Sequence, residues 1–147
     1  MKIDTIRVTQ LSRDHVAAWR ALQLADPALD SPLFHPEFTQ AVATVRDDVE
    51  VAVLEEAGQL VGFFPFERSR GNVGRPVAGS LADMQGIVLR NDIELDAAQL
   101  IRECGLTTWQ FDHLIASQRM FQPYHAFVDD SPYIDLSAGY VAEPDEE

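Results

Sequence analysis

Residues 49–69 read VEVAVLEEAGQLVGFFPFERS and contain the clearest supersecondary pattern in the chain. Two runs rich in β-forming residues flank Glu56-Ala57-Gly58, and Gly58 can take the positive φ that a short hairpin loop commonly needs. The first run is apolar on one face, whereas residues 59–69 carry apolar side chains at both parities of the strand period. This second run therefore predicts a central strand covered on both faces by helical layers. Pro65 lacks a backbone donor, so we expect the neighbouring strand to depart near it.

Helical and extended patterns surround this hairpin. Residues 3–9 alternate apolar and polar side chains, which predicts a strand near a sheet edge. A helix is predicted after Ser12, which is its expected N-cap, and Pro27 ends it. A second helix is predicted with Pro36 as its first residue. The later predicted elements, in chain order, are a strand at 84–89, a helix from Leu95 that Gly105 closes, a strand at 107–115, a helical turn at 116–121, a strand at 124–130 and an extended stretch at 131–137.

The charge balance and length exclude several classes of protein. The chain has 147 residues, with 11 Lys plus Arg against 24 Asp plus Glu and a net charge of −13. Such a field repels a phosphate backbone, so we expect no nucleic-acid partner. No apolar run approaches the roughly 20 residues of a membrane-spanning helix, and the N-terminus lacks a secretory h-region. We expect no membrane insertion, a cytoplasmic location, one domain over residues 1–140 and an acidic disordered tail at 141–147.

The predicted order of elements is uncommon among small α/β domains. Two helices lie between the first and second strands, and a three-strand meander and another helix follow. This order resembles that of the acyl-CoA N-acyltransferase (GNAT) fold, in which the fourth and fifth strands splay apart and admit the acyl-thioester. The expected fold class is therefore α/β (α+β): a GNAT-like mixed, mostly antiparallel sheet with helices on both faces.

Several stretches together resemble one branch of that superfamily. They are SPLFHPEFTQAVATVRDDVEVAVLEEAGQLVGFFPFERS, LADMQGIV, ECGLTTWQFDHL and SPYIDLS. They are similar to the N-terminal half of the CelD/BcsL-type acetyltransferases of cellulose and exopolysaccharide biosynthesis, which are related to the Fem peptidyltransferases. The resemblance covers roughly residues 15 to 137. It implies an acyl-CoA-dependent N- or O-acyltransferase, acetyl-CoA or another acyl-CoA as cofactor of the full-length family, a sugar or amine acceptor, and a second GNAT-like half or partner chain.

The chain departs from the GNAT pattern at the loop that should hold the cofactor's diphosphate. That loop, Arg/Gln-x-x-Gly-x-Gly/Ala, normally opens the helix after the fourth strand and binds phosphate through backbone amides and the helix dipole. Here residues 87–100 read IVLRNDIELDAAQL, without glycine, and Asp92, Glu94 and Asp96 would repel a diphosphate. We therefore expect this half to bind no coenzyme A and to contribute acceptor binding. The alternative is a non-catalytic pseudo-acyltransferase that binds a partner chain or forms a homodimer.

Four polar residues are candidates for substrate binding, and no catalytic residue is assigned. Asp112 and His113 end a predicted strand, where the imidazole could act as a general base on an amine. Adjacent strand residues point to opposite faces, so we do not expect these two to pair, and a strand-end turn is the plainer interpretation. Asp83 and Gln85 share a face and could bond a polar substrate, although a turn explains them equally well.

The other reactive residue types have structural interpretations. Cys104 is most simply a small buried hydrophobe, and one cysteine allows neither an intramolecular disulfide nor a multi-cysteine metal site. His35 is interpreted as a helix-start residue, and Trp19 and Trp109 as core residues. A basic cluster, Arg68, Arg70 and Arg75, could meet an anionic sugar or nucleotide but is by default a solvated loop.

Overall fold

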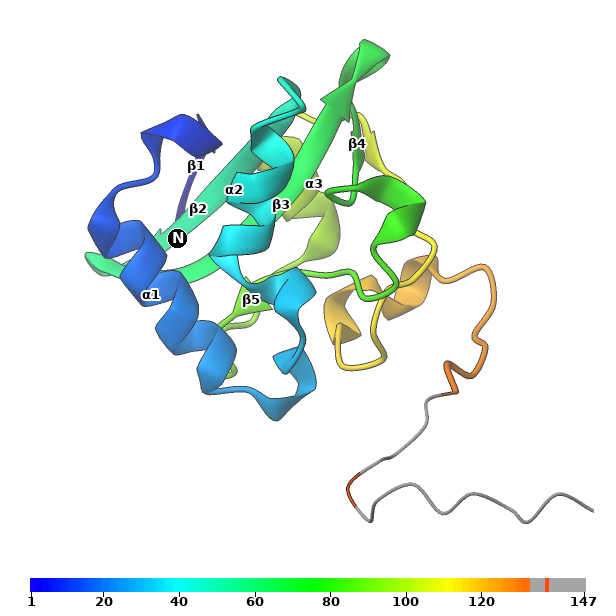
Figure 1. The fold of residues 1–147 in the computed structure, drawn as a ribbon. Helices are drawn as coiled ribbons and strands as arrows, with labels where there is room; N and C mark the ends of the chain where they lie inside the picture. The colour runs from blue at the N-terminus through cyan, green and yellow to red at the C-terminus, as the bar shows by residue number, and fades with distance from the viewer. Residues whose placement is uncertain (133–136, 138–147) are drawn as a thin grey trace, which may run out of the picture.

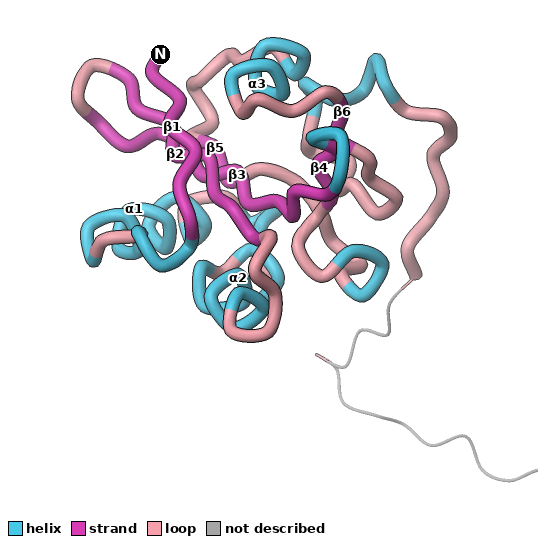
Figure 2. Tube along the Cα trace, turned by 90° about the horizontal axis from the view of Figure 1, so that it is seen from above, coloured by secondary structure: helices cyan, strands magenta, loops and turns pink. Residues whose placement is uncertain are grey.

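The computed structural model describes residues 1–132 and Ser137 (Figures 1 and 2). Most of the predicted extended stretch at 131–137 and all of the predicted tail at 141–147 lie outside the described residues. No helix of the described part is long and apolar enough to cross a bilayer.

A six-stranded sheet runs through the middle of the molecule, and its strands follow the order β1-β2-β3-β4-β6, with β5 paired to β3. All neighbouring pairs are antiparallel except β4 and β6, which run parallel. This confirms the predicted mixed, mostly antiparallel sheet, with its first strand at an edge. The strands are β1 (Lys2–Arg7), β2 (Val49–Glu56), β3 (Gln59–Ser69), β4 (Val73–Arg75), β5 (Val88–Leu89) and β6 (Thr108–Trp109).

The predicted hairpin is confirmed. A two-residue turn joins β2 and β3, and both of its residues have positive φ, 49° at Ala57 and 79° at Gly58. Two positive φ values in succession match the right-handed twist of the flanking strands. The hairpin is the longest paired region of the sheet, and Val51 lies opposite Pro65 in its register.

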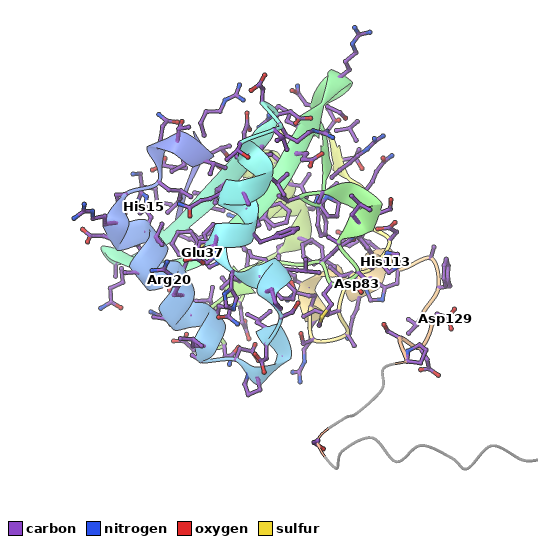
Figure 3. All side chains as sticks on the ribbon, in the orientation of Figure 1. His15, Arg20, Glu37, Asp83, His113 and Asp129 are labelled. Atoms are coloured by element: carbon purple, nitrogen blue, oxygen red, sulfur yellow. The ribbon has the colours of Figure 1, made fainter. Side chains whose placement is uncertain are left out.

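Helices cover both faces of the sheet (Figure 2). Helices α1 (Arg13–Leu24) and α2 (Pro36–Ala43) lie on one face, and α3 (Ala97–Glu103) lies on the other. The predicted caps are present: the Ser12 hydroxyl accepts from the His15 amide at 3.1 Å, and Pro36 opens α2. An ion pair between Arg20 and Glu37 links the first two helices (Figure 3).

Strand β3 is buried on both faces, as its sequence predicts. Phe63 stacks on Trp19 of α1 with ring centroids 5.0 Å apart, and both side chains are fully buried. Phe64 and Phe66 belong to the core cluster on the α3 side, where Phe64 meets Trp109 edge-on at 5.0 Å. Because one strand supplies both clusters, it holds the two helical layers together.

The sheet has a gap beside Pro65. On the side of β3 away from β2, Gly62 and Phe63 pair with β5, and residues 67–69 pair with β4. No strand pairs with residues 64–66 on that side within the described chain, because residues 76–87 leave the sheet there. The predicted departure of the neighbouring strand near Pro65 is therefore confirmed.

Three predicted strands are wrong or too long. The predicted strand at 84–89 keeps only β5, and the one at 107–115 keeps only β6 plus an isolated bridge between Gln85 and Leu114. Apart from the backbone bonds of that bridge, the side chains of Gln85 and Gln118 bond the backbone at residues 112–113 and at Ile87. Residues 124–130 form no strand: a 3-10 helix at Arg119–Tyr124 contains Pro123, and Phe127 and Val128 are 80% exposed.

Candidate functional site

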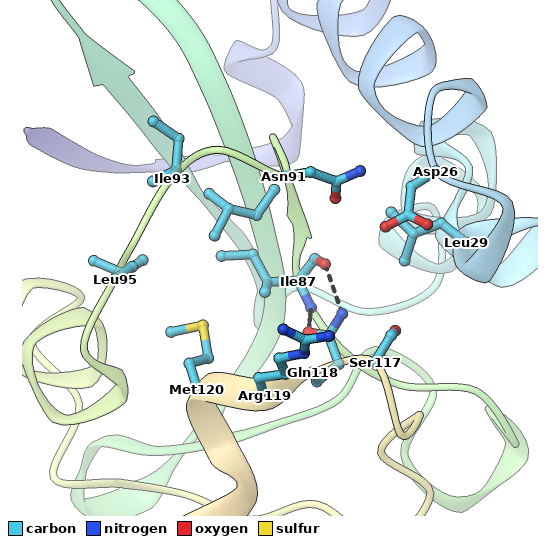
Figure 4. Close-up of a pocket in the computed structure, with 11 residues that line it drawn as sticks. Asp26, Leu29, Ile87, Asn91, Ile93, Leu95, Ser117, Gln118, Arg119 and Met120 are labelled. Carbon is cyan, nitrogen blue, oxygen red and sulfur yellow. Dashed lines mark hydrogen bonds between the residues drawn. The ribbon is translucent and has the colours of Figure 1, made fainter.

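The larger of two cavities in the described residues, of about 380 Å³, lies beside β5 and the loop that leads from it to α3 (Figure 4). Residues 117–120 form the opposite wall, and the turn after α1 closes one end. Its lining combines an apolar floor with a polar rim. The floor residues are Leu29, Ile87, Leu89, Ile93, Leu95 and Met120, and the rim residues are Asp26, Asn91, Ser117, Gln118 and Arg119.

Gln118 joins the two walls of this cavity. Its carboxamide oxygen accepts from the Ile87 amide at 2.8 Å, and its nitrogen donates to the Ile87 carbonyl at 3.2 Å (Figure 4). These are the backbone groups that a further strand would bond. A Cβ on Gly86 would lie 2.5 Å from the Gln118 carboxamide carbon, so only glycine allows this close approach. The side chain therefore replaces strand pairing at the point where the sheet is open.

The rim carries both signs of charge. The Asp26 carboxylate caps the Ala28 amide at 2.9 Å and is partly exposed. Arg119 is exposed and forms no ion pair with any described residue. Figure 4 shows Asn91 and Asp26 at one end of the cavity and Arg119 beside Gln118. This rim can donate to and accept from a neutral polar ligand, and Asp26 can also face an amine.

The N-terminus of α3, where the GNAT resemblance would place a diphosphate, does not fit that group. The Asp96 carboxylate accepts from the Gln99 amide at 2.8 Å and so takes one of the donors that a phosphate would need. Arg90 is paired with Asp92 at 2.6 Å and donates to Gln59 at 3.3 Å. The bond from Arg90 lowers the pKa of Asp92, which keeps that carboxylate ionised. The capped amide and the carboxylates at this helix end therefore do not favour a diphosphate.

Gln85, one of the predicted substrate-binding residues, is 3% exposed and fully engaged in protein contacts. Its nitrogen donates to the Asp112 carboxylate at 2.6 Å and to the Ala82 carbonyl at 2.9 Å. Its oxygen accepts from the amides of Asp112 at 3.1 Å and His113 at 3.0 Å. The side chain therefore fastens the 79–85 segment to the residues that follow β6.

Asp112 and His113 do pair, contrary to the expectation from strand geometry. Strand β6 ends at Trp109, so these residues lie in a bend, and the His113 Nδ1 is 3.3 Å from Asp112 Oδ1. The hydrogen bond from Gln85, and to a smaller degree His113, lowers the pKa of Asp112. The structure thus brings together three of the four predicted residues. Asp83 is exposed (Figure 3), and none of the four lines the larger cavity.

The remaining reactive residues have the structural roles predicted for them, except Arg68. Cys104 is buried, and burial raises the pKa of its thiol to about 12 against the opposite effects of Thr5 and Arg68. Arg68 is not a solvated loop residue, because it bonds Glu50 at 2.7 Å and the Cys104 carbonyl at 2.8 Å. His35 is the N-cap of α2, and the described residues include no cluster of possible metal ligands.

The rim residues of the larger cavity were not predicted from the sequence. In the sequence, Asp26 stands next to Pro27, which ends the first predicted helix, and Asn91 follows the predicted strand at 84–89; neither position indicates a ligand. Gln118 and Arg119 lie in a segment predicted as a helical turn without a site. The polar run Ser117-Gln118-Arg119, next to apolar Met120, is the one local signal for this wall.

The comparisons with known proteins identify the fold. No protein-family model matches the chain, and no curated protein matches it either. Among solved structures, AAC(6′)-Iy in complex with the bisubstrate analog CoA-S-monomethyl-acetylneamine is 16% identical, with 97% of this chain and 99% of that chain covered and a TM-score of 0.50. A ribosomal-protein-alanine N-acetyltransferase from Brucella melitensis biovar Abortus 2308 is 13% identical, with 92% and 99% covered and a TM-score of 0.47.

The likeness to AAC(6′)-Iy shows that this chain has the fold of the GNAT acetyltransferases, which confirms the predicted fold class. The resemblance to the CelD/BcsL-type branch stays a prediction.

Proposed function

We propose that this chain is a GNAT-like domain of an acyl-CoA-dependent N- or O-acyltransferase and that it binds the acceptor rather than coenzyme A. The observation that carries the proposal is the contrast between two neighbouring features. Asp96 caps the helix end where a diphosphate would bind, while a cavity of about 380 Å³ lies next to it. The fold favours acyl transfer, and the acidic helix end argues against cofactor binding by this half.

The lining of the larger cavity favours a sugar or amine acceptor. An apolar floor can pack against the C–H groups of a sugar ring, and the rim offers donors and acceptors for hydroxyl groups. Asp26 can bind an amine, and the net charge of −13 attracts a cationic acceptor. We place the reaction in polysaccharide or cell-envelope biosynthesis, in the cytoplasm, on the strength of the resemblance alone.

A second GNAT-like half or a partner chain supplies the acyl-CoA in this proposal. The Asp112–His113 pair, exposed and 3.3 Å apart, is the candidate that could take a proton from the acceptor. Because it does not line the larger cavity, an acceptor would have to extend beyond that cavity to reach it.

The proposal is tested by titrating glucosamine into the 15N-labelled chain and following the amide resonances. We expect saturable shifts confined to residues around the larger cavity, such as Asn91 and Arg119, and a several-fold weaker affinity for Asp26→Asn. Arg102→Gln removes an exposed charge on α3 away from the cavity lining and serves as the matched control. Shifts at the N-terminus of α3 with acetyl-CoA, or none at the cavity with glucosamine, would contradict it.

One observation favours the alternative of a non-catalytic interaction module. Phe127 and Val128 are 80% exposed, and Tyr124 is 56% exposed on the same segment. Apolar side chains exposed together can mark a surface that meets another chain. Sedimentation equilibrium distinguishes the two: a homodimer that Phe127→Ser converts to monomer supports the module, and a monomer at all concentrations argues against a homodimer.

A further inference from the structure

A second, smaller cavity lies in the gap of the sheet beside Pro65. It measures about 20 Å³ and shares no lining residue with the larger cavity. Helix α2, the excursion at residues 76–86 and the end of β6 surround it. The wall is mainly apolar, and the residues are Leu33, Phe34, Phe38, Thr39, Pro65, Pro76, Val77, Ala82, Met84, Gln85, Gly86 and Trp109.

Two residues of this wall have buried polar atoms without a hydrogen-bond partner among the described residues. They are the Thr39 hydroxyl and the Trp109 indole nitrogen, on residues that are 1% and 9% exposed. Leaving such a group unpaired costs about 1–3 kcal/mol, so native proteins contain few of them. Both residues line one small cavity, Thr39 from helix α2 and Trp109 from strand β6, so one partner in that cavity is the simplest way to satisfy both groups.

The chemistry of the two groups defines that partner. An indole N–H can only donate, and a hydroxyl can donate or accept, so the partner must present a lone pair to Trp109. No cation or carboxylate lines this cavity, and Gln85 has its amide fully engaged elsewhere. The apolar wall therefore favours a neutral group. A volume of about 20 Å³ admits one atom group the size of a water molecule.

We propose that this cavity is a binding site for a single neutral oxygen, which accepts a hydrogen bond from Trp109 and bonds the hydroxyl of Thr39. A water molecule and the hydroxyl or carbonyl oxygen of a small ligand share this chemistry. The site is separate from the larger cavity, so it goes beyond the proposed acceptor function and does not depend on it.

The indole resonances of the full 15N-labelled chain test this site. Trp19 is an internal reference, because its indole nitrogen donates to the Phe34 carbonyl at 2.8 Å. We expect the Trp109 indole proton, and not that of Trp19, to show a cross-peak to bound water. Thr39→Val keeps the shape and removes the hydroxyl, so it should remove or weaken that cross-peak. Thr44→Val, whose hydroxyl bonds the Ala41 carbonyl instead, is the matched control.

Titration with formamide distinguishes the two sources of oxygen. A saturable shift of the Trp109 indole resonance with loss of the water cross-peak assigns the site to a ligand oxygen, and Thr39→Val should weaken that binding about 2- to 12-fold. A water cross-peak that formamide leaves unchanged assigns it to a fixed water. The proposal is overturned if the Trp109 indole shows neither a water cross-peak nor a formamide shift and does not respond to Thr39→Val.

Discussion

At the scale of single residues, Asp96 caps the N-terminus of α3. Its carboxylate bonds the Gln99 amide at 2.8 Å, so the short helix carries its own anion at its N-terminus. We predict that Asp96→Ala lowers the free energy of unfolding by about 1 kcal/mol, the usual value for a lost N-cap. Urea denaturation of the variant and the parent protein measures this change in the free energy of unfolding. Glu94→Ala, in the same loop but without a hydrogen bond to the helix among the described residues, should change the free energy of unfolding far less. Equal losses in both variants would contradict the capping role.

Cys104 is expected to be inert in the folded protein. Burial raises the pKa of its thiol to about 12, so almost no thiolate forms near neutral pH. We predict that the thiol reacts with a disulfide reagent at pH 8 more than about a hundredfold slower than in the urea-unfolded chain. The absorbance of the released thiolate reports the rate. A fast reaction with the native protein would show that the site opens.

The lowered pKa of Asp112 predicts a small pH dependence of the free energy of unfolding. Its pKa is lowered in the folded protein, chiefly by the bond from Gln85, so the carboxylate stabilises the fold above its ordinary pKa of 3.8. That contribution disappears as the pH falls below 3.8 through the lowered folded value. We predict that Asp112→Asn costs less than about 1 kcal/mol at pH 7, because the group is exposed, and that the cost becomes smaller as the pH falls below 3.8 to pH 2. An unchanged difference between these pH values would refute the assignment.

At the scale of elements, the opening of the sheet depends on Gly86 and Gln118. Gly86 has a φ of +156°, and a Cβ there would lie 2.5 Å from the Gln118 carboxamide carbon. We predict that Gly86→Ala destabilises the protein by about 1–3 kcal/mol and speeds hydrogen exchange at the Ile87 amide, which Gln118 protects. Gly71→Ala is the control. Gly71 also has a positive φ, but no atom lies near its Cβ position, so this substitution should leave hydrogen exchange at the Ile87 amide unchanged.

The strands show how far the sequence predicts the fold. The hairpin is predictable because its strand period and the turn residues Ala57 and Gly58 are local features. The short β5 and β6 are not, because the amides of Gln85 and Gln118 bond backbone groups up to 31 residues away and replace strand pairing. A pattern of β-forming residues cannot indicate that a distant side chain will replace a neighbouring strand.

The candidate site is less predictable than the fold for the same reason. Its rim comes from Asp26, Asn91 and Arg119, which lie far apart in the sequence and face one cavity only after the helices pack on the sheet. The acidic helix end is the part that the sequence does indicate, because the absence of glycine and the presence of Asp92 and Asp96 are local.

At the scale of the whole molecule, an acetyltransferase fold is combined with a net charge of −13 and a diphosphate position that carries carboxylates. Both features oppose an anionic cofactor, and the larger cavity offers a neutral or cationic acceptor a place next to that position. This contrast is the basis for our proposal that this chain binds the acceptor and that a second acyltransferase-like unit supplies the acyl-CoA.

The most direct test is a calorimetric titration of acetyl-CoA into the full 147-residue chain at physiological salt. The account predicts no heat of binding beyond dilution, because Asp96 occupies a helix-end donor and the loop before it is acidic. Micromolar binding, with amide shifts at Gln99 in a parallel NMR titration, would contradict it.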